Sequence, residues 1–273
     1  MSNYLEQFRR ELEFSHLAQG TEYRYIQTAK RYLEYTKDKP LFSREEIIGF
    51  VESLGATTST YKSWALRILR RFYEALQKPW PLRRREGPRI EDRSQPYVTT
   101  QDVGTMLELA KESRRDYALF QILIDTLCRR DEISKLDRDN YRHGQLIIDL
   151  SKREGTRTVK LTTPAKKALE DYLKSRRDEN PALFVTHRDE RMSPDAIGFI
   201  VKDYMVKAGI YRPGMGAHAF RRGGVRHLAM KKIPKMDIQA WGGWKTSAMV
   251  DRYAQLAPAD VAEDIAAAKP LRS

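Results

Sequence analysis

Apolar side chains recur at helical spacing in four segments of the N-terminal part of the chain. The members of each set are Leu5, Phe8 and Leu12; Ile26, Ala29 and Leu33; Ile47, Phe50, Val51 and Leu54; Ala65, Ile68, Leu69, Phe72 and Leu76. This spacing places each set on one face of an α-helix. Ser43 precedes Glu46 by three residues, which is typical of a capping box at the start of the third helix. We therefore predict a four-helix domain over residues 1–77, whose fourth helix runs from about Ser59 to Gln77.

Residues 78–98 interrupt this pattern. Their sequence, KPWPLRRREGPRIEDRSQPYV, holds four prolines, one glycine and five arginines without a helical period. Proline and glycine at this density break regular elements, so we interpret the segment as a linker between two domains. The clustered arginines favour contact with a phosphate backbone over a merely solvated linker.

A domain of mixed class follows over residues 99–273. Thr99 and Asp102 give a second capping signal, and the apolar stretch from Tyr117 to Leu127 predicts a buried helix. Further on, the pattern is helical again and ends in an Ala-rich segment over residues 258–269.

Between these helical parts lies a predicted β-hairpin. Short β-like runs cover residues 146–150 and 158–161, and the basic turn SKREGTR joins them. Thr163-Pro164 and Ser193-Pro194 each combine an N-cap with a first-turn proline, so helices are expected to begin there. The predicted fold class is therefore mainly α with a small antiparallel β-sheet.

The charge balance narrows the function classes. The 273 residues include 50 Lys and Arg against 37 Asp and Glu, a formal net charge of +13, and the sequence pI is near 9.7. Such an excess favours a polyanionic partner, first of all nucleic acid. An acidic membrane surface is the alternative, but the basic residues are spread along the chain rather than gathered in one amphipathic helix. No membrane-length apolar stretch or signal peptide is evident, so we expect a cytoplasmic, nucleoid-associated protein.

Metal and cofactor chemistry is not expected. Cys128 is the one cysteine, and the five scattered histidines offer no ligand-spaced set. The sequence also lacks a G-x-x-x-x-G-K-[ST] phosphate-binding loop. We therefore expect no metal, no cofactor and no use of ATP.

Two stretches of the second domain place arginines where an anion could bind. In TLCRRDEISKL, residues 126–136, two arginines follow an apolar helix, where they are costly unless a carboxylate pairs with them or an anion faces them. In GAHAFRRGGVRHLA, residues 216–229, His218 and Arg221 are three apart and share one face if the stretch is helical. Each pattern alone is weak.

A third stretch, WGGWKTSAMVDRY, places Trp244 nine residues before Tyr253. Taken singly, such aromatic residues are more typical of a core than of a catalytic site. Taken together and in this order, the three stretches resemble the tyrosine recombinase (phage integrase) family. The residues at the family's six catalytic positions are Arg129, Lys152 of the hairpin, His218, Arg221, Trp244 and Tyr253. The resemblance covers about residues 99–273, while residues 1–77 match only as a four-helix domain ahead of a linker, similar to the family's SAM-like core-binding domain.

The chain departs from the family's motifs. In the pattern T-G-L-R-x-x-E-L-x-x-L, Leu127 stands where glycine is usual, and GGW stands where a separate motif of the family has L-G-H. Arg130 adjoins Arg129 and Arg222 adjoins Arg221, so each arginine assignment could shift by one. Register with the neighbouring glutamate and histidine of the motifs favours Arg129 and Arg221.

The resemblance implies a site-specific recombinase that cleaves DNA through a 3′-phosphotyrosyl intermediate on Tyr253. Two guanidiniums suit the charge that grows on the phosphate oxygens, and His218 is the matched residue able to act as a base near neutrality. Lys152 is the predicted acid for the leaving 5′-oxygen, and Lys160 is the alternative. Trp244 is expected to position the phosphate or to pack beneath the site.

Basic residues of the first domain and the linker are the predicted DNA contacts. They are Lys62, Arg67, Arg70, Arg71, Arg83, Arg84, Arg85 and Arg89. For the four on the fourth helix, a solvated surface is an equally good interpretation. The resemblance further implies a tetramer on double-stranded DNA, in which the C-terminal helix docks on a neighbour. Val261 and Ile265 give that helix an apolar stripe, which would serve equally well for packing on its own domain.

Three alternatives remain open at this point. A type IB topoisomerase would share the chemistry but relax DNA as a monomer, without joining two sites. A catalytically inactive DNA-binding protein of the same fold would form no covalent adduct. A metal-dependent transposase or nuclease would lose its activity in EDTA.

Overall fold

The computed structural model describes residues 2–17, 19–39, 41–55, 59–83, 86–87, 95–149 and 155–254. The chain divides into two compact units, Met1–Arg93 and Ser94–Ser273. The division falls inside the segment predicted to be a linker. The predicted Ala-rich helix at residues 258–269 lies outside the described residues.

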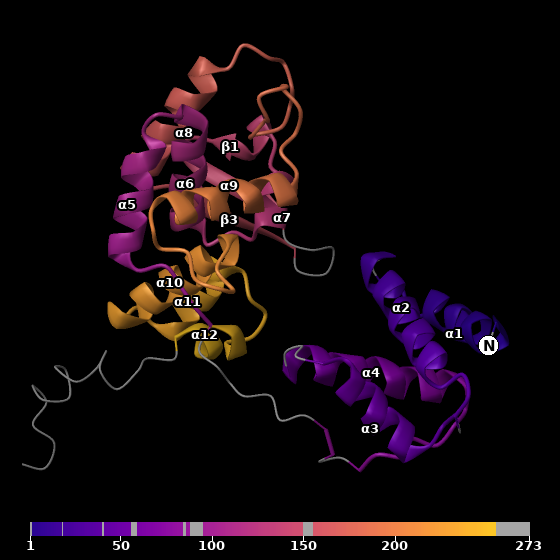
Figure 1. The fold of residues 1–273 in the computed structure, drawn as a ribbon. Helices are drawn as coiled ribbons and strands as arrows, with labels where there is room; N and C mark the ends of the chain where they lie inside the picture. The colour runs from indigo at the N-terminus through magenta and orange to yellow at the C-terminus, as the bar shows by residue number, and fades with distance from the viewer. Residues whose placement is uncertain are drawn as a thin grey trace, which may run out of the picture. The chain divides into compact units, whose positions relative to one another are not determined.

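The N-terminal unit contains the four predicted helices, α1 Ser2–Glu13, α2 Gln19–Tyr35, α3 Arg44–Ser53 and α4 Ser59–Ala75 (Figure 1). The apolar faces predicted from the sequence point into one core, in which only Leu5 among the predicted residues is partly exposed. Ser43 caps α3, because its hydroxyl accepts a hydrogen bond from the backbone N–H of Glu46 at 3.2 Å. Aromatic rings fill the centre of the unit, where the Tyr32 and Tyr73 hydroxyls lie 2.7 Å apart.

The residues that follow α4 belong to this core. Trp80 packs edge-on against Tyr73 with 5.2 Å between the ring centroids, and Leu82 is buried. The first part of the predicted linker is therefore anchored on the helical unit by its two large apolar side chains.

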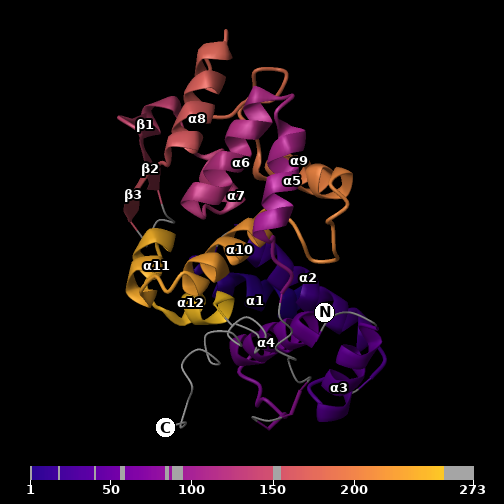
Figure 2. The ribbon, with the colours of Figure 1, turned by 90° about the vertical axis from the view of Figure 1, so that its left-hand side faces the viewer.

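The C-terminal unit is mainly helical, as expected. Its helices are α5 Thr100–Ala110, α6 Arg114–Thr126, α7 Arg130–Ser134, α8 Thr163–Ser175, α9 Pro194–Lys207, α10 Ala217–Met230, α11 Lys235–Gly242 and α12 Ala248–Tyr253, with a 3-10 turn at Arg138–Asn140. Figures 1 and 2 show α8 toward one end of the unit and α10, α11 and α12 gathered at the other, with the sheet extending between them. No helix in the described ranges is long and apolar enough to cross a membrane.

The small sheet of this unit has three antiparallel strands in the order β1, β2, β3. They are β1 Tyr141–Arg142, β2 Gln145–Asp149 and β3 Thr156–Lys160. Ile147 of β2 pairs with Thr158 of β3, which confirms the predicted hairpin, whereas β1 is too short to have left a periodic signal. The hairpin's tip, residues 150–154, lies outside the described residues.

Caps place the helices close to where the sequence predicts them. Thr99 and Asp102 form a reciprocal capping box on α5, and the Ser193 hydroxyl accepts from the Ala196 N–H at the start of α9. The expectation for α8 was off by one residue. Thr162 is its N-cap in an extended conformation and Thr163 is already helical, so Pro164 takes the second position of the first turn.

A separate apolar cluster joins the last three helices. Its buried members are Leu127, Val225, Ile238, Trp244 and Val250, and the ring of Tyr253 packs on it. The cluster fixes α12 against α10 and α11, so the last described helix has a defined place in the unit.

Candidate active site

Tyr253 and His218 meet through their polar atoms. His218 lies in the first turn of α10 and Tyr253 ends α12, and the imidazole Nε2 is 2.7 Å from the phenol oxygen. The two rings are inclined at 72° with 5.6 Å between centroids. At 2.7 Å the Nε2 atom and the phenol oxygen form a hydrogen bond, along which a proton can pass from the phenol to a neutral imidazole.

Arg221, one helical turn after His218, forms the floor of the site and has no exposed surface. Its guanidinium donates to the carbonyls of Leu127 at 2.5 Å and Gly242 at 2.8 Å, and it lies 4.1 Å from the centre of the Trp244 ring. Leu127 adopts a left-handed conformation, φ +53°, at the end of α6, and thus provides the first of these acceptors.

Trp244 packs beneath Arg221 rather than reaching outward. Among the described residues, its buried indole N–H has no hydrogen-bond partner. A Cβ at Gly242 would overlap the Trp244 ring, and Gly243 has φ +67°, so the two glycines of the GGW motif are needed for this close packing. Of the two roles expected for Trp244, the geometry here corresponds to packing.

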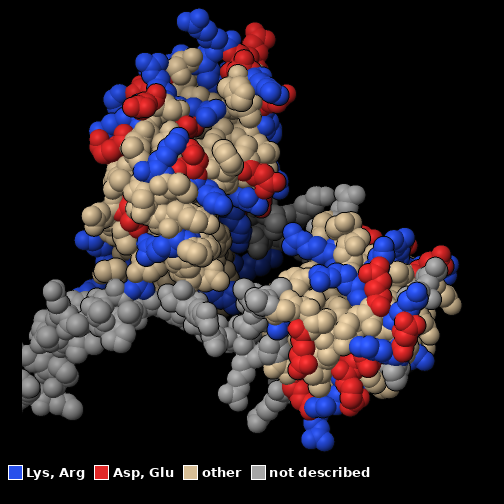
Figure 3. Space-filling view, in the orientation of Figure 1, with Lys and Arg blue, Asp and Glu red and all other residues tan. Residues whose placement is uncertain are grey.

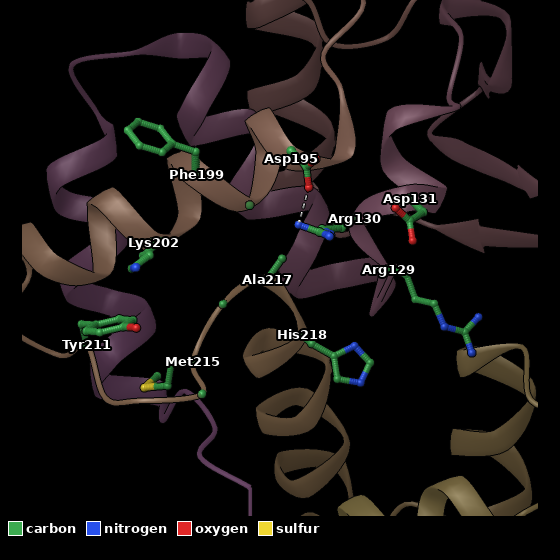
Figure 4. Close-up of a pocket in the computed structure, with 13 residues that line it drawn as sticks. Arg129, Arg130, Asp131, Asp195, Phe199, Lys202, Tyr211, Met215, Ala217 and His218 are labelled. Carbon is green, nitrogen blue, oxygen red and sulfur yellow. Dashed lines mark ion pairs between the residues drawn. The ribbon is translucent and has the colours of Figure 1, made fainter. Parts of the chain in front are cut away.

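Arg129 lies at the rim of the site, immediately before α7. Its backbone N–H and its guanidinium both donate to the Glu132 carboxylate, at 3.0 and 2.7 Å. Its side chain is 34% exposed, so an anion can approach it directly. Figure 4 shows the Arg129 and His218 side chains pointing to the same side, away from Lys202 and Tyr211.

Glu132 is buried, and its carboxylate interacts with both Arg129 and Arg221. Its Oε2 lies 3.8 Å from the Arg221 guanidinium, while its Oε1 accepts from the Arg129 guanidinium. Burial alone would raise the pKa of Glu132, but the Arg129 backbone N–H and the charges of Arg221 and Arg129 outweigh it and hold the pKa below its usual range. The carboxylate is therefore ionised at neutral pH and neutralises part of the cationic cluster.

The electrostatic environment keeps His218 neutral. His218 lines an open pocket, yet its pKa falls to about 4. The largest cause is desolvation of the ring, which disfavours the charged form, and the nearby charges of Arg222, Arg221 and Arg129 lower the pKa further. Burial also lowers the pKa of Arg221 to about 10, which leaves it charged at neutral pH. The site thus pairs a neutral base with fixed cations.

The neighbouring arginines have other partners. Arg130 pairs with Asp195 of α9 at 3.1 Å. Arg222 donates to the carbonyls of Pro96 at 2.7 Å and Gly214 at 3.2 Å, and so ties the residues before α5 to α10. Of the two possible registers, Arg129 with Arg221 is the pair that shares Glu132.

A cavity of about 690 Å³ opens beside these groups. Arg129 and His218 line one part of it, and Phe199, Lys202 and Tyr211 line another (Figure 4). Figure 3 shows Lys and Arg side chains gathered on the C-terminal unit around α7 and β3, as located in Figure 1. The entrance to the site is therefore suited to an anion.

The two predicted lysines have different outcomes. Lys152 lies outside the described residues. Lys160 lines a different, largely apolar pocket of about 570 Å³, which contains none of the other predicted catalytic residues.

Arg157 is the polar residue of the site that sequence reasoning missed. Its side chain is 7% exposed and its guanidinium lies 3.6 Å from Glu132. Strand alternation could have found it, because Arg157 and Val159 lie two apart on β3 and both face inward.

In the N-terminal unit, the structure brings three of the predicted DNA contacts together. Arg67 and Arg70 of α4 and Arg83 line a shallow pocket of about 660 Å³ next to Trp80. Arg71 instead donates to Ser15 and lies over the Tyr25 ring. Lys62 is partly buried, and Arg84, Arg85 and Arg89 lie outside the described residues. Figure 3 shows charges of both signs interspersed on this unit.

Comparison with known proteins gives a consistent result. The model of the phage integrase family matches residues 96–260. The chain is similar to tyrosine recombinase XerA of Pyrococcus furiosus, with 24% identity over 285 residues that span 100% of this chain and 96% of the relative. It is also similar to tyrosine recombinase XerD of Oceanobacillus iheyensis, with 28% identity over 238 residues, 78% of this chain and 79% of the relative.

Solved structures share the fold. A crystal structure of XerA recombinase has a TM-score of 0.61 and 21% identity, and the alignment covers 99% of this chain and 100% of that one. A lambda integrase dimer bound to a core site has a TM-score of 0.78 and 17% identity, over 93% of this chain and 95% of that one.

Proposed function

We infer the chemistry of the site from one premise: the chain belongs to the phage integrase family of tyrosine recombinases. It is a site-specific recombinase, an enzyme that cleaves and rejoins DNA strands. We propose that the Tyr253 oxygen attacks a backbone phosphorus and displaces the 5′-oxygen of the next nucleotide. The products are a 3′-phosphotyrosyl bond and a free 5′-hydroxyl, which in the second half of the reaction attacks the same linkage on a partner strand.

The observation that carries this proposal is the 2.7 Å contact between His218 Nε2 and the Tyr253 oxygen. A neutral imidazole at hydrogen-bond distance can take the phenolic proton as the new P–O bond forms. The low pKa of His218, about 4, keeps this base unprotonated over the neutral range.

Arg129 and Arg221 are proposed to stabilise the charge on the non-bridging oxygens. Arg129 is accessible at the rim, while Arg221 adds its charge from the floor beneath. Charged donors fixed before the reaction lower the transition state without reorganising during it. Trp244 supports Arg221 from below, and the proton for the leaving oxygen is assigned to Lys152, because Lys160 lines a different pocket from the other site residues.

The first domain, residues 1–77, and the basic linker 78–98 are proposed to hold double-stranded DNA. The grouping of Arg67, Arg70 and Arg83 around one shallow pocket supports phosphate binding there. We propose that the protein works where DNA is, in the cytoplasm and at the nucleoid.

Assembly into a tetramer on DNA through the C-terminal helix is part of the same proposal. The apolar pocket of about 570 Å³, lined by Val103, Ile124, Leu228, Ile233 and Trp241 among others, is a surface that the apolar stripe of Val261 and Ile265 could cover. Removal of residues 255–273 should then abolish higher assembly on DNA, measured by light scattering, while cleavage by each subunit persists.

The proposal is tested with a pool of nicked duplexes whose sequence is randomised around the nick. Cleavage next to a nick releases a short fragment, so the covalent adduct accumulates. We expect the wild-type chain to form an adduct in EDTA and Tyr253→Phe to form none. Tyr211→Phe, which changes a tyrosine that lines the cavity beside the site, should form it normally. Adduct formation by Tyr253→Phe or loss of activity in EDTA would contradict the proposal, and relaxation of supercoiled DNA without strand exchange would favour a topoisomerase.

A further inference from the structure

Arg157 connects three parts of the C-terminal unit that contribute to the site. It lies on β3, and its guanidinium donates to the carbonyl of Trp241 at the end of α11 and to the Cys128 sulfur at 3.4 Å. It also lies 3.6 Å from Glu132. Only 7% of its side chain is exposed, and these protein groups surround its guanidinium.

The contact with α11 links Arg157 directly to Arg221. The last carbonyls of a helix lack partners within it and favour cations. In α11, Arg157 binds the carbonyl of Trp241, and Arg221 binds the carbonyl of the next residue, Gly242. The two guanidiniums therefore hold the same helix end, from which the chain continues through Trp244 to Tyr253.

The contact with Glu132 links Arg157 to Arg129. Glu132 has one negative charge and three guanidiniums near it, those of Arg129, Arg157 and Arg221. Arg157 lies 3.6 Å from the same carboxylate oxygen that is 3.8 Å from Arg221. Loss of Arg157 would leave that oxygen to Arg221 and the Arg129 backbone N–H, which changes the interactions that position the two arginines proposed to stabilise the transition state.

We propose that Arg157 is a positioning residue for strand cleavage: it fixes the end of α11 and the Glu132 carboxylate, and through them the orientation of Arg221 and Arg129. Arg157 does not touch the substrate. This inference rests on the proposed function, because it concerns how the arginines meet the scissile phosphate.

The test compares two substrates on Arg157→Gln, Arg157→Lys and the wild-type chain. Both are the nicked duplex recovered from wild-type adducts, one with a normal scissile phosphodiester and one with a neutral methylphosphonate at that position. A methylphosphonate places one negative charge fewer on the transition state, so correctly oriented arginines matter less to it. Arg142→Gln, an exposed arginine of the same sheet, is the matched control.

We expect Arg157→Gln to slow phosphodiester cleavage at least about tenfold and methylphosphonate cleavage less than about threefold, with DNA affinity unchanged. Arg157→Lys keeps the charge and should recover part of the loss, and it carries the comparison if the Gln variant does not fold. Equal slowing on both substrates, or no slowing, would overturn the inference. Failure of the wild-type chain to form any adduct would instead overturn the proposed function.

Discussion

The two arginines that share Glu132 occupy opposite environments. Arg129 stands at the rim with 34% of its side chain exposed, whereas Arg221 is closed into the floor by the Leu127 and Gly242 carbonyls and the Trp244 ring. A rim cation can bind the phosphate directly at little cost to folding. A floor cation without solvent depends on its protein partners, so its catalytic charge and its structural role are inseparable. This difference predicts that substitutions of Arg129 and Arg221 differ more in their effect on the unfolding free energy than in their effect on the cleavage rate.

Replacement of the floor cation should have the largest effect. Arg221→Ala is expected to lower the unfolding free energy by about 3–5 kcal/mol, since it leaves buried partners unpaired. It should also slow single-turnover cleavage by about 10²–10³-fold. Denaturant unfolding and adduct formation measure the two effects. A loss of less than about tenfold in cleavage would point to Arg222 as the phosphate ligand, and Arg222→Ala is therefore the paired variant.

Replacement of the rim cation should affect mainly the rate. Arg129→Ala is expected to slow cleavage by about 10²–10³-fold. It should lower the unfolding free energy by only about 1 kcal/mol, because the buried Glu132 keeps Arg157, Arg221 and the backbone N–H of residue 129 as partners. Arg130→Ala, which removes the neighbouring arginine and its pair with Asp195, is the control. If Arg129→Ala unfolds the protein as readily as Arg221→Ala does, the distinction between rim and floor fails.

The pH dependence tests the cluster's effect on His218. Its pKa of about 4 lies below the ordinary value, so the ring is neutral in folded and unfolded chains above about pH 6.5. As the pH falls from there toward 4, the unfolded chain binds the proton first, and the folded state loses stability. The unfolding free energy of the wild-type chain should therefore decline over this pH range, and that of His218→Asn should decline less. The cleavage rate of the wild-type chain should stay constant between about pH 5 and 8. A cleavage rate that halves near pH 6.5 would contradict the assignment.

The smallest effect is expected far from the chemistry, in the N-terminal unit. Changing both Arg67 and Arg70 to Gln should weaken DNA binding. It should also reduce the slope of log affinity against log salt concentration by about 2, since each phosphate contact contributes about 0.9 to that slope. The rate of cleavage from the bound state should not change. Arg9 and Arg10, exposed on α1, provide a matched double substitution that should leave the slope unaltered.

The part of the fold that local pattern determines could be predicted from the sequence. Helical spacing of apolar residues found α1 to α4, and caps located α5 and α9. Two short β-like runs joined by a basic turn predicted the hairpin, but β1 is only two residues long. These elements follow from residues within one or two turns of each other, which is why a single sequence suffices for them.

The depth of each site residue could not be predicted, because it depends on partners far apart in the chain. Arg221 is buried by the Leu127 and Gly242 carbonyls, which are 94 and 21 residues away. In the sequence, Arg157 belongs to the basic turn of the predicted hairpin. In the structure it lies on β3 and faces inward, where its guanidinium donates to Cys128 and to the Trp241 carbonyl. A motif specifies residue type and order, whereas tertiary packing decides whether a side chain lies at the rim or in the floor of the site.

The central claim is that Tyr253 forms the covalent bond to DNA, and the most direct test is the chemical identity of the trapped linkage. Adducts of the wild-type chain with the nicked pool are digested with protease and nuclease and analysed by mass spectrometry. The account predicts a nucleotide joined through its 3′-phosphate to the peptide that contains Tyr253, with a 5′-hydroxyl on the released strand. A linkage to another residue, a 5′-phosphate linkage, or cut DNA without any peptide attached would contradict it.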